Sequence, residues 1–417
     1  MPDNSAQLEP AALLPRDGWL LFATRGTRLF AYGAISVILV LYLAGLGLSD
    51  AKIGLLLSLT LIGDTVVSLG LTTHADRWGR RRTLLAGAVL MVLAGIVFAA
   101  TGNFLLLLVA ATIGVISPSG NEVGPFLSVE QAALSQVVSD RRRTGVFAWY
   151  SLIGSLTTAL GALAGGVATQ WIQAYSSPEI AYRSVIVTYA LLGLLLALLF
   201  TRLTPAVEVD AAHARSERPR FGVSRRSRPV VLRLCGLFGL DAFAGGFVLQ
   251  SIVAYWFHLR FGVDPAMLGG IFFGANLFAG LSALWAARLA ARFGLVNTMV
   301  FTHLPSNVLL ILVPLMPNLT LAIVVLLLRF SISQMDVPTR QSYTMAVVGP
   351  EERAAAAGMT GVARTTGAAI APLFVGPMFA NPLLLGLPFF LGGGLKIVYD
   401  VLLYRSFIAR KPPEEQA

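Results

Sequence analysis

The stretch 74–82, His-Ala-Asp-Arg-Trp-Gly-Arg-Arg-Arg, lies between two long apolar segments, and six of its nine residues are charged or titratable. The segments on either side, 53–73 and 83–102, are rich in leucine, valine and alanine. So polar a run between two such segments is typical of a short loop at a membrane surface. Its arginines predict that the loop faces the cytoplasm, because basic residues gather in cytoplasmic loops.

This loop resembles the signature loop of the major facilitator superfamily, G-x-L-a-D-R-x-G-R-[KR], which joins helices 2 and 3 of that fold. The positions that match in register are Asp76, Arg77, Gly79, Arg80 and Arg81. Thr72 replaces the first glycine of the pattern, and His74 replaces its leucine.

The resemblance implies that the matching residues form a gating loop. In the family, the loop aspartate binds the start of helix 11 and a basic residue near the end of helix 4. Here the aspartate is Asp76, and its partners would be residues 354–358 and one of the arginines at 141–143. We count Arg143 among the gating candidates.

The composition is that of a polytopic membrane protein. Of the 417 residues, 56% are hydrophobic and 12% are charged, and the mean hydropathy is +0.75. A soluble domain carries about a quarter charged residues. The first 18 residues are polar and include Pro10 and Pro15, so we expect no cleavable signal peptide.

The sequence favours no catalytic or cofactor chemistry. Its single cysteine, Cys235, excludes an internal disulfide. It contains no phosphate-binding loop and no His/Cys cluster with metal-ligand spacing. We therefore predict neither an enzyme nor a bound cofactor or metal, and no nucleic-acid partner.

Twelve apolar segments are long enough to cross a bilayer, since about 20 residues in a helix span its hydrocarbon core. They lie near 20–46, 53–73, 83–102, 104–135, 145–170, 184–203, 231–257, 266–287, 297–316, 319–345, 355–379 and 383–404. Basic residues gather in every second loop, which predicts that both termini lie in the cytoplasm. We expect an integral membrane protein, a monomer in the cytoplasmic (inner) membrane of a bacterium.

The twelve segments divide into two similar halves. Gly54 with Gly269 and Gly79 with Gly294 are each 215 residues apart (269 − 54 and 294 − 79), and Arg143 with Arg353 is 210 apart (353 − 143). Duplicated halves are typical of secondary transporters. The fold class that we predict is an all-α polytopic membrane protein with twelve transmembrane helices in two pseudo-symmetric six-helix halves. Its parts are an N-terminal tail 1–18, a first half 19–203, a cytoplasmic linker 204–229, a second half 230–404 and a tail 405–417.

Two predicted helices, one in each half, are interrupted at matching positions. Residues 117–125 in helix 4 contain two prolines and two glycines, and in helix 10 Pro338 follows Asp336 within the interrupted stretch 331–340. Matched interrupted helices point to a binding site at the middle of the membrane. The alternative is a simple packing kink in each helix.

Several ionisable residues lie deep in the apolar segments, where a charge costs at least ~2.5–3.5 kcal/mol. Such residues face the bundle interior or a wet cavity and mark substrate or proton routes. The proton-coupling candidates are Asp64, Glu122, Asp336 and Asp241. The substrate-binding candidates are Asn121, Glu122, Arg329, Asp336, Arg340, Arg364 and Arg28.

Spacing within single helices suggests which of these charges meet. Arg329 precedes Asp336 by seven residues, which puts both on one face of a continuous helix, and Arg340 follows Asp336 at i+4. Each charge could instead belong to a buried structural ion pair. We favour that interpretation for Lys396 and Asp400, an i,i+4 pair in helix 12. We interpret His303 as a polar residue with satisfied partners. For Arg340, and for Glu130 near the cytoplasmic end of helix 4, a gate or interface role is the alternative to ligand binding.

Helix 5 carries the glycines Gly161, Gly165 and Gly166. Their spacing is similar to the G-P-x-x-G-G motif of the superfamily's drug/proton antiporters, with Ala162 in place of proline. Close helix packing through small residues is the alternative explanation.

The resemblance implies a secondary transporter that works by alternating access on a small molecule and protons. Our leading hypothesis is proton-coupled export (antiport) of a small organic molecule. The first alternative is proton-linked uptake of a small organic anion, which Arg329 and Arg364 favour. The second alternative is a non-transporting membrane sensor or assembly partner built on a transporter scaffold.

Overall fold

The computed structural model describes residues 14–138, 140–208, 224–225, 227–349 and 352–408, and none of these residues lies in a β-strand. The first half contains α1 (Arg16–Gly45), α2 (Asp50–Trp78), α3 (Arg80–Ala100), α4 (Phe104–Ile113), α5 (Phe126–Val137), α6 (Asp140–Gln173) and α7 (Pro178–Thr201). The short helix η2 (Pro205–Val207) follows it. The second half contains α9 (Arg228–Gly246), α10 (Gln250–Phe261), α11 (Pro265–Phe293), α12 (Leu295–Leu312), η3 (Val313–Leu315), α13 (Leu319–Ser333), α14 (Asp336–Ala346), α15 (Arg353–Ile370), α16 (Pro372–Phe379), η5 (Pro382–Leu384) and α17 (Leu387–Phe407).

The predicted all-helical membrane fold is confirmed. Ten helical segments in the described part of the chain are long and apolar enough to cross a membrane. The two remaining predicted spans, 104–135 and 355–379, are each built from two shorter helices, α4 with α5 and α15 with α16. This arrangement is consistent with twelve crossings.

The interruption predicted in helix 4 is a long one. The chain leaves the helical path after α4 and resumes it at α5, and Gly120 and Gly124 in between have positive φ angles of 70° and 79°. Only glycine adopts this conformation without strain. Asn121 is exposed within the segment, and its carbonyl oxygen accepts a hydrogen bond from the Ser117 hydroxyl at 2.7 Å.

The interruption predicted in helix 10 is short, because α13 ends at Ser333 and α14 begins at Asp336. Two more helices are broken where the sequence analysis predicts continuous spans. α9 ends at Gly246 and α10 begins at Gln250, while α15 and α16 meet at Ala371 before Pro372. A Gly-Gly pair and a proline, respectively, mark these two breaks in the sequence.

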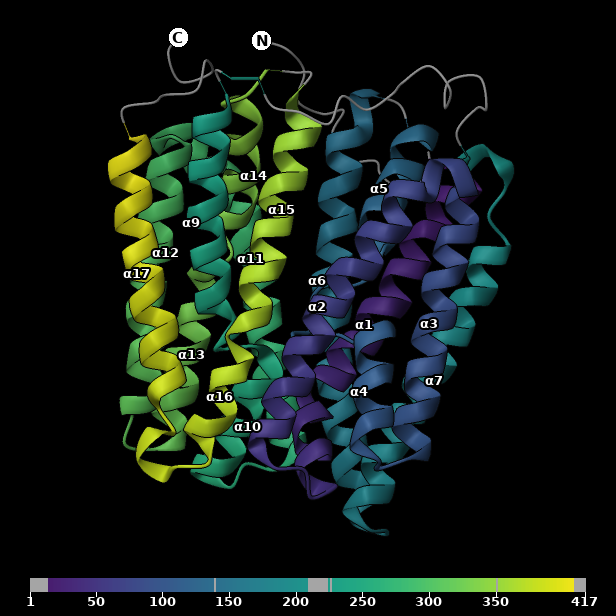
Figure 1. Cartoon of the computed structure of the whole chain (residues 1–417), viewed down its shortest axis with the longest axis vertical. Coiled ribbons are helices and arrows are strands. Elements are labelled where there is room, and N and C mark those ends of the chain that lie inside the picture. The colour runs from purple at the N-terminus through teal and green to yellow at the C-terminus, as the bar shows by residue number, and fades with distance from the viewer. Residues whose placement is uncertain (1–13, 139, 209–223, 226, 350–351, 409–417) are drawn as a thin grey trace.

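The two halves stand side by side, and the start of α1 and the end of α17 lie at the same end of the bundle (Figure 1). We call the opposite end the far end. α10, α16 and the first turns of α2 gather there, where the halves converge (Figure 1). The far end is therefore where contacts between the halves have to be sought.

Glycines bring the two halves into backbone contact at two places. At the first, a Cβ atom on Gly54 of α2 would collide with the carbonyl oxygen of Pro372, and one on Gly376 of α16 with that of Asp50. At the second, a Cβ on Gly166 of α6 would collide with the carbonyl oxygen of Pro265 at the start of α11. We call these contacts the two glycine crossings.

The glycines of predicted helix 5 lie in α6, and they serve close helix packing, which is the alternative explanation given in the sequence analysis. Any side chain on Gly161 would meet the backbone of Phe30 in α1, and any on Gly165 that of Ala34. Gly166, one residue on, reaches the other half instead. Small residues are what such close helix approach requires.

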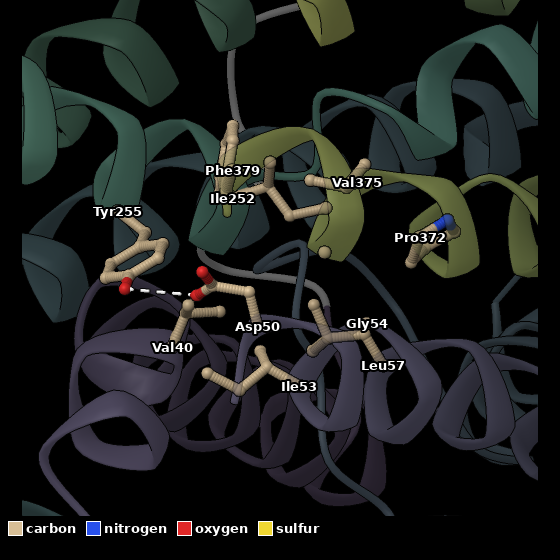
Figure 2. A pocket seen from close by; sticks show the side chains of 11 residues that line it. Val40, Asp50, Ile53, Gly54, Leu57, Ile252, Tyr255, Pro372, Val375 and Phe379 are labelled. Atoms are coloured by element: carbon tan, nitrogen blue, oxygen red, sulfur yellow. Dashed lines mark hydrogen bonds between the residues drawn. The ribbon is translucent and has the colours of Figure 1, made fainter. Parts of the chain in front are cut away.

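Three hydrogen bonds join the halves in the described part of the chain, and α10 contributes to each of them. Gln250 donates to the Ser36 hydroxyl at 2.8 Å, and the Ser251 amide donates to the Pro118 carbonyl at 3.1 Å. The Tyr255 hydroxyl donates to Asp50 at 3.3 Å, above a small apolar pocket between α2, α10 and α16 (Figure 2). The far end is therefore closed.

Candidate functional site

A buried ion-pair network in the first half joins α1 to α5. Arg28 binds Glu130 through both terminal nitrogens, at 2.8 and 2.9 Å. Glu130 also accepts hydrogen bonds from the hydroxyls of Thr24, at 2.9 Å, and of Tyr150. Neither charged side chain is exposed. Burying an ion pair is costly unless its remaining hydrogen bonds are made, and here the Glu130 carboxylate has them.

Glu122 extends this network into the unwound segment between α4 and α5. Its carboxylate binds Arg25 at 2.5 Å and Arg28 at 3.0 Å. The guanidinium of Arg25 also lies 4.3 Å above the ring of Tyr150. Of the two acids, Glu122 alone is partly exposed, by 19% of its side chain. Arg28 was predicted to bind substrate, but both of its terminal nitrogens bind carboxylates of the protein.

Asp64 in α2 faces the same unwound segment but is held differently. Its Oδ1 accepts hydrogen bonds from the Gly124 amide at 2.5 Å and the Ser68 hydroxyl at 3.2 Å. The other three proton-coupling candidates each pair with at least one arginine or lysine. Asp64 pairs with none in the described chain, so it can take up a proton without breaking an ion pair.

The burial difference between Glu130 and Glu122 gives a stability prediction. Glu130→Gln leaves Arg25 and Arg28 to share the single carboxylate of Glu122, so one positive charge of the buried network is uncompensated. We expect the variant to lower the free energy of unfolding by about 3–5 kcal/mol. Glu122→Gln is the matched control, because water can reach its site, and we expect a clearly smaller loss. Thermal unfolding of the purified variants in one detergent measures both. Equal losses would show that burial does not set the cost.

A second cluster surrounds Asp241 of α9 in the other half. Asp241 binds Lys396 of α17 at 2.5 Å and Arg340 of α14 at 3.0 Å. Arg340 also binds Asp336, one turn earlier on α14, at 3.1 Å. All four side chains are at most 10% exposed. The predicted contact between Asp336 and Arg340, both on α14, is thus present. Arg340 also binds Asp241 on α9.

The predicted pair of Lys396 with Asp400 is absent from the described structure. Lys396 reaches across to Asp241, and Asp400 binds His303 at 2.8 Å and Asn307 at 2.9 Å, both on α12. The two residues lie one turn apart on α17 but bind different neighbouring helices. His303 has polar partners, in line with its interpretation from the sequence.

The spacing that puts Arg329 and Asp336 on one face applies to a continuous helix, and the helix is interrupted between them. The turn between α13 and α14 separates the two residues, and no ion pair joins them in the described structure. The Arg329 guanidinium lies 4.9 Å above the ring of Phe330 instead.

Arg329 and Arg364 share a property that the other intramembrane arginines lack. Neither forms an ion pair with a carboxylate among the described residues, although Asp241 and Asp336 attract both from a greater distance. The Nε atom of each is buried without a hydrogen-bond partner, as are those of Arg25, Arg28 and Arg183. Both side chains are partly exposed. They therefore leave two positive charges, on α13 and α15, available to an anion.

The gating loop is only partly described. The side chains of Asp76 and of residues 141–143, Arg143 included, lie outside the described residues, so the predicted bridge stays a prediction. At the described positions, Gly79 has a φ of 100°, and Glu208 accepts hydrogen bonds from the amides of Arg80 at 2.7 Å and Arg81 at 3.1 Å. Arg77 is exposed. A carboxylate of the predicted linker thus caps the start of α3.

The sequence analysis left Arg25, Tyr150 and Asn307 out of the site. Arg25 precedes Arg28 by nearly one helical turn in an apolar segment, and that spacing was a usable signal. Tyr150 and Asn307 gave no such signal, because uncharged polar residues are common in transmembrane helices. Only the packing of α6 and α12 brings them to the acids.

Two halves of membrane-spanning helices, with interrupted helices and buried charges in each, define a helical membrane transporter. A family model described as Major Facilitator Superfamily matches residues 21–372. A relative from Saccharomyces cerevisiae (strain ATCC 204508 / S288c), "Uncharacterized membrane protein YJR124C", is 31% identical over 423 residues, covering 94% of this chain and 94% of its own. The chain belongs to the major facilitator superfamily.

Solved structures agree in fold. A bacterial homologue of the human lysosomal transporter Spinster, inward-facing and unoccupied, is 16% identical with a TM-score of 0.69, covering 95% of this chain and 98% of its own. A D-xylose–proton symporter is 15% identical with a TM-score of 0.71 over the same shares. The human organic anion transporter MFSD10 is 18% identical with a TM-score of 0.61, over 93% of this chain and 100% of its own.

Proposed function

We propose that this transporter carries a small organic anion together with protons, by alternating access. The observation that supports this best is the pair Arg329 and Arg364, neither of which forms an ion pair with a described carboxylate, although Asp241 and Asp336 attract both from a greater distance. A substrate anion would supply the missing partner through charge-assisted hydrogen bonds. Asp64 is the acid that we assign to the proton, because it alone among the candidates lacks a cationic partner in the described chain.

The conformation supports the alternating-access part of the proposal. The halves are joined at the far end by α10 and the two glycine crossings. If the termini are cytoplasmic, as the distribution of basic residues predicts, the closed end faces outward and this conformation opens inward.

Export of an organic molecule against protons is the second candidate, which the glycine motif of predicted helix 5 favoured weakly. The helix-5 glycines that suggested it are engaged in packing against α1 and across the halves. The two directions differ in the gradient that drives accumulation inside proteoliposomes. An acidic outside drives anion uptake with protons, whereas an acidic inside drives the antiport mode. A panel of labelled carboxylates and uncharged analogues, tested under both gradients, decides between them.

Replacing either unpaired arginine gives the test of substrate charge. Arg329→Gln or Arg364→Gln should weaken binding of an acidic substrate at least about tenfold, since one hydrogen bond to a charged group contributes about 1.5–3 kcal/mol. Binding of a neutral analogue should change little. The matched control is Arg183→Gln, which removes a half-exposed arginine paired with Glu179 outside the site. Equal losses for acidic and neutral compounds would identify structural arginines and reject the anion proposal. A chain that moves no compound in either gradient would support the sensor alternative.

A further inference from the structure

His303 of α12 lies between two carboxylates of the second cluster. Its Nδ1 atom is 2.8 Å from Asp400, and its Nε2 atom is 3.8 Å from Asp241. The side chain is 5% exposed. Asn307, one turn later, donates to Asp400 at 2.9 Å and so fixes the carboxylate that faces the imidazole. Both ring nitrogens therefore point at negatively charged groups.

This position matches the charged form of the ring better than the neutral one. A neutral imidazole carries one N–H group. With that proton on Nδ1, the ring donates to Asp400, while Nε2 presents a lone pair to the Asp241 oxygen. The imidazolium has an N–H on both nitrogens, so it donates a hydrogen bond to Asp400 and also places its positive charge 3.8 Å from Asp241.

The charge balance of the bonded cluster leads to the same conclusion. Its carboxylates are Asp241, Asp336 and Asp400, and its permanent cations are Arg340 and Lys396. Three acids against two cations leave one negative charge, which a proton on His303 cancels. Uncompensated charge in a buried site is costly.

The neighbouring helices add two more charges and one aromatic ring. Tyr399 of α17 packs its ring edge-on to His303, at 5.8 Å between centroids. Arg329 on α13 and Arg364 on α15 bring unpaired positive charge to the same half. Both arginines interact with Asp241, the acid that faces Nε2 of His303. We therefore expect their charges to oppose protonation of His303, and a bound anion to weaken that opposition.

We propose that His303 is a second proton-binding group of this transporter, and that its proton and an anion held by Arg329 and Arg364 stabilise one another. The inference rests on the proposed function, because it takes the substrate to be an anion. In the step itself, Nε2 takes a proton from a hydronium ion, which leaves a water molecule. Because binding linkage is reciprocal, each ligand strengthens the other by the same factor.

Nuclear magnetic resonance of the full-length protein in lipid nanodiscs, with ¹⁵N-labelled histidine, tests this without a known substrate. The chain has four histidines, and His303→Gln identifies the signal. The measured quantity is the ratio of charged to neutral His303 imidazole, at the pH where the wild type shows equal amounts. Asp400→Asn should lower that ratio about tenfold, since it removes the bonded negative partner. The double variant Arg329→Gln/Arg364→Gln imitates a bound anion and should raise the ratio at least about threefold.

Asp64→Asn separates this inference from the proposed function, because Asp64 lies in the other half. It should leave the His303 ratio unchanged, whatever it does to transport. The inference is overturned if the ratio is the same in the wild type and the double variant, or if His303 stays neutral from pH 5 to 9. The double variant keeps every bond of the Asp241 cluster, so its result stands even if Asp400→Asn fails to fold.

Discussion

Asp64→Asn should abolish proton-driven accumulation of substrate in proteoliposomes, down to the level of empty liposomes. An asparagine imitates the protonated acid permanently, so it cannot take up a proton on one side and release it on the other. Exchange of labelled for unlabelled substrate needs no net proton movement and should persist. Parallel measurement of pH-gradient-driven uptake and of exchange, on one preparation, gives both results.

Two variants control for the substitution itself. Asp64→Glu keeps an acid at the same place and should retain part of the coupling. Asp264→Asn makes the same chemical change at an exposed residue that caps the start of α11, and it should leave both activities near the wild-type level. Full pH-driven accumulation by Asp64→Asn would refute the assignment, and Glu122, Asp336 and Asp241 would then be the acids to test.

Gly166→Val should hold the far end open and strongly reduce transport. Any side chain at this position collides with the Pro265 carbonyl oxygen, so the crossing cannot close as it does here. Overpacking of a tight contact costs about 1–3 kcal/mol, which shifts the balance between closed and open forms roughly tenfold. A cysteine in place of Ser36, buried under Gln250, reports the opening by its labelling with a membrane-impermeant maleimide. The native Cys235 is replaced beforehand, so that only the introduced cysteine reacts with the maleimide.

The control for this experiment lies in the partner helix. A Cβ at Gly270 of α11 has nothing within 4 Å, so Gly270→Val adds the same side chain without a collision. It should leave both transport and Ser36→Cys labelling near the wild-type level. If Gly166→Val keeps the introduced cysteine protected, the crossing does not determine closure of the far end.

The fold was accessible from the sequence because it depends on long, local signals. Each span is a run of about 20 apolar residues, and the signature loop marks the turn between two of them. The break after α4 was equally local, since its prolines and glycines lie within a few residues of one another. The break after Gly246 was missed because the Gly-Gly pair that marks it lies within an apolar run that continues on both sides.

The site could be predicted only as far as the identity of its charged residues. Charged residues near the middle of a membrane span are the candidates for a functional role, and their depth follows from counting residues along each predicted helix. Pairing depends instead on which helices are neighbours, and Lys396 shows this, since it passes over Asp400 on its own helix to reach Asp241 on α9. The sequence could not show that Arg329 and Arg364 form no ion pair, because that depends on every side chain that packs around them.

The two glycine crossings have a consequence for how the protein moves. Gly54 contacts Pro372 and Gly269 contacts Ala162, and these residues correspond under the repeat offsets, since 269 − 54 = 215 and 372 − 162 = 210. Gly376 contacts Asp50 and Gly166 contacts Pro265 in the same relation (376 − 166 = 210 and 265 − 50 = 215). The halves therefore meet as two copies of one subunit meet in an isologous dimer, where each patch binds its own equivalent. A rocking motion of one half against the other, about an axis perpendicular to that twofold axis, moves both equivalent crossings together, so we expect them to separate in the same step.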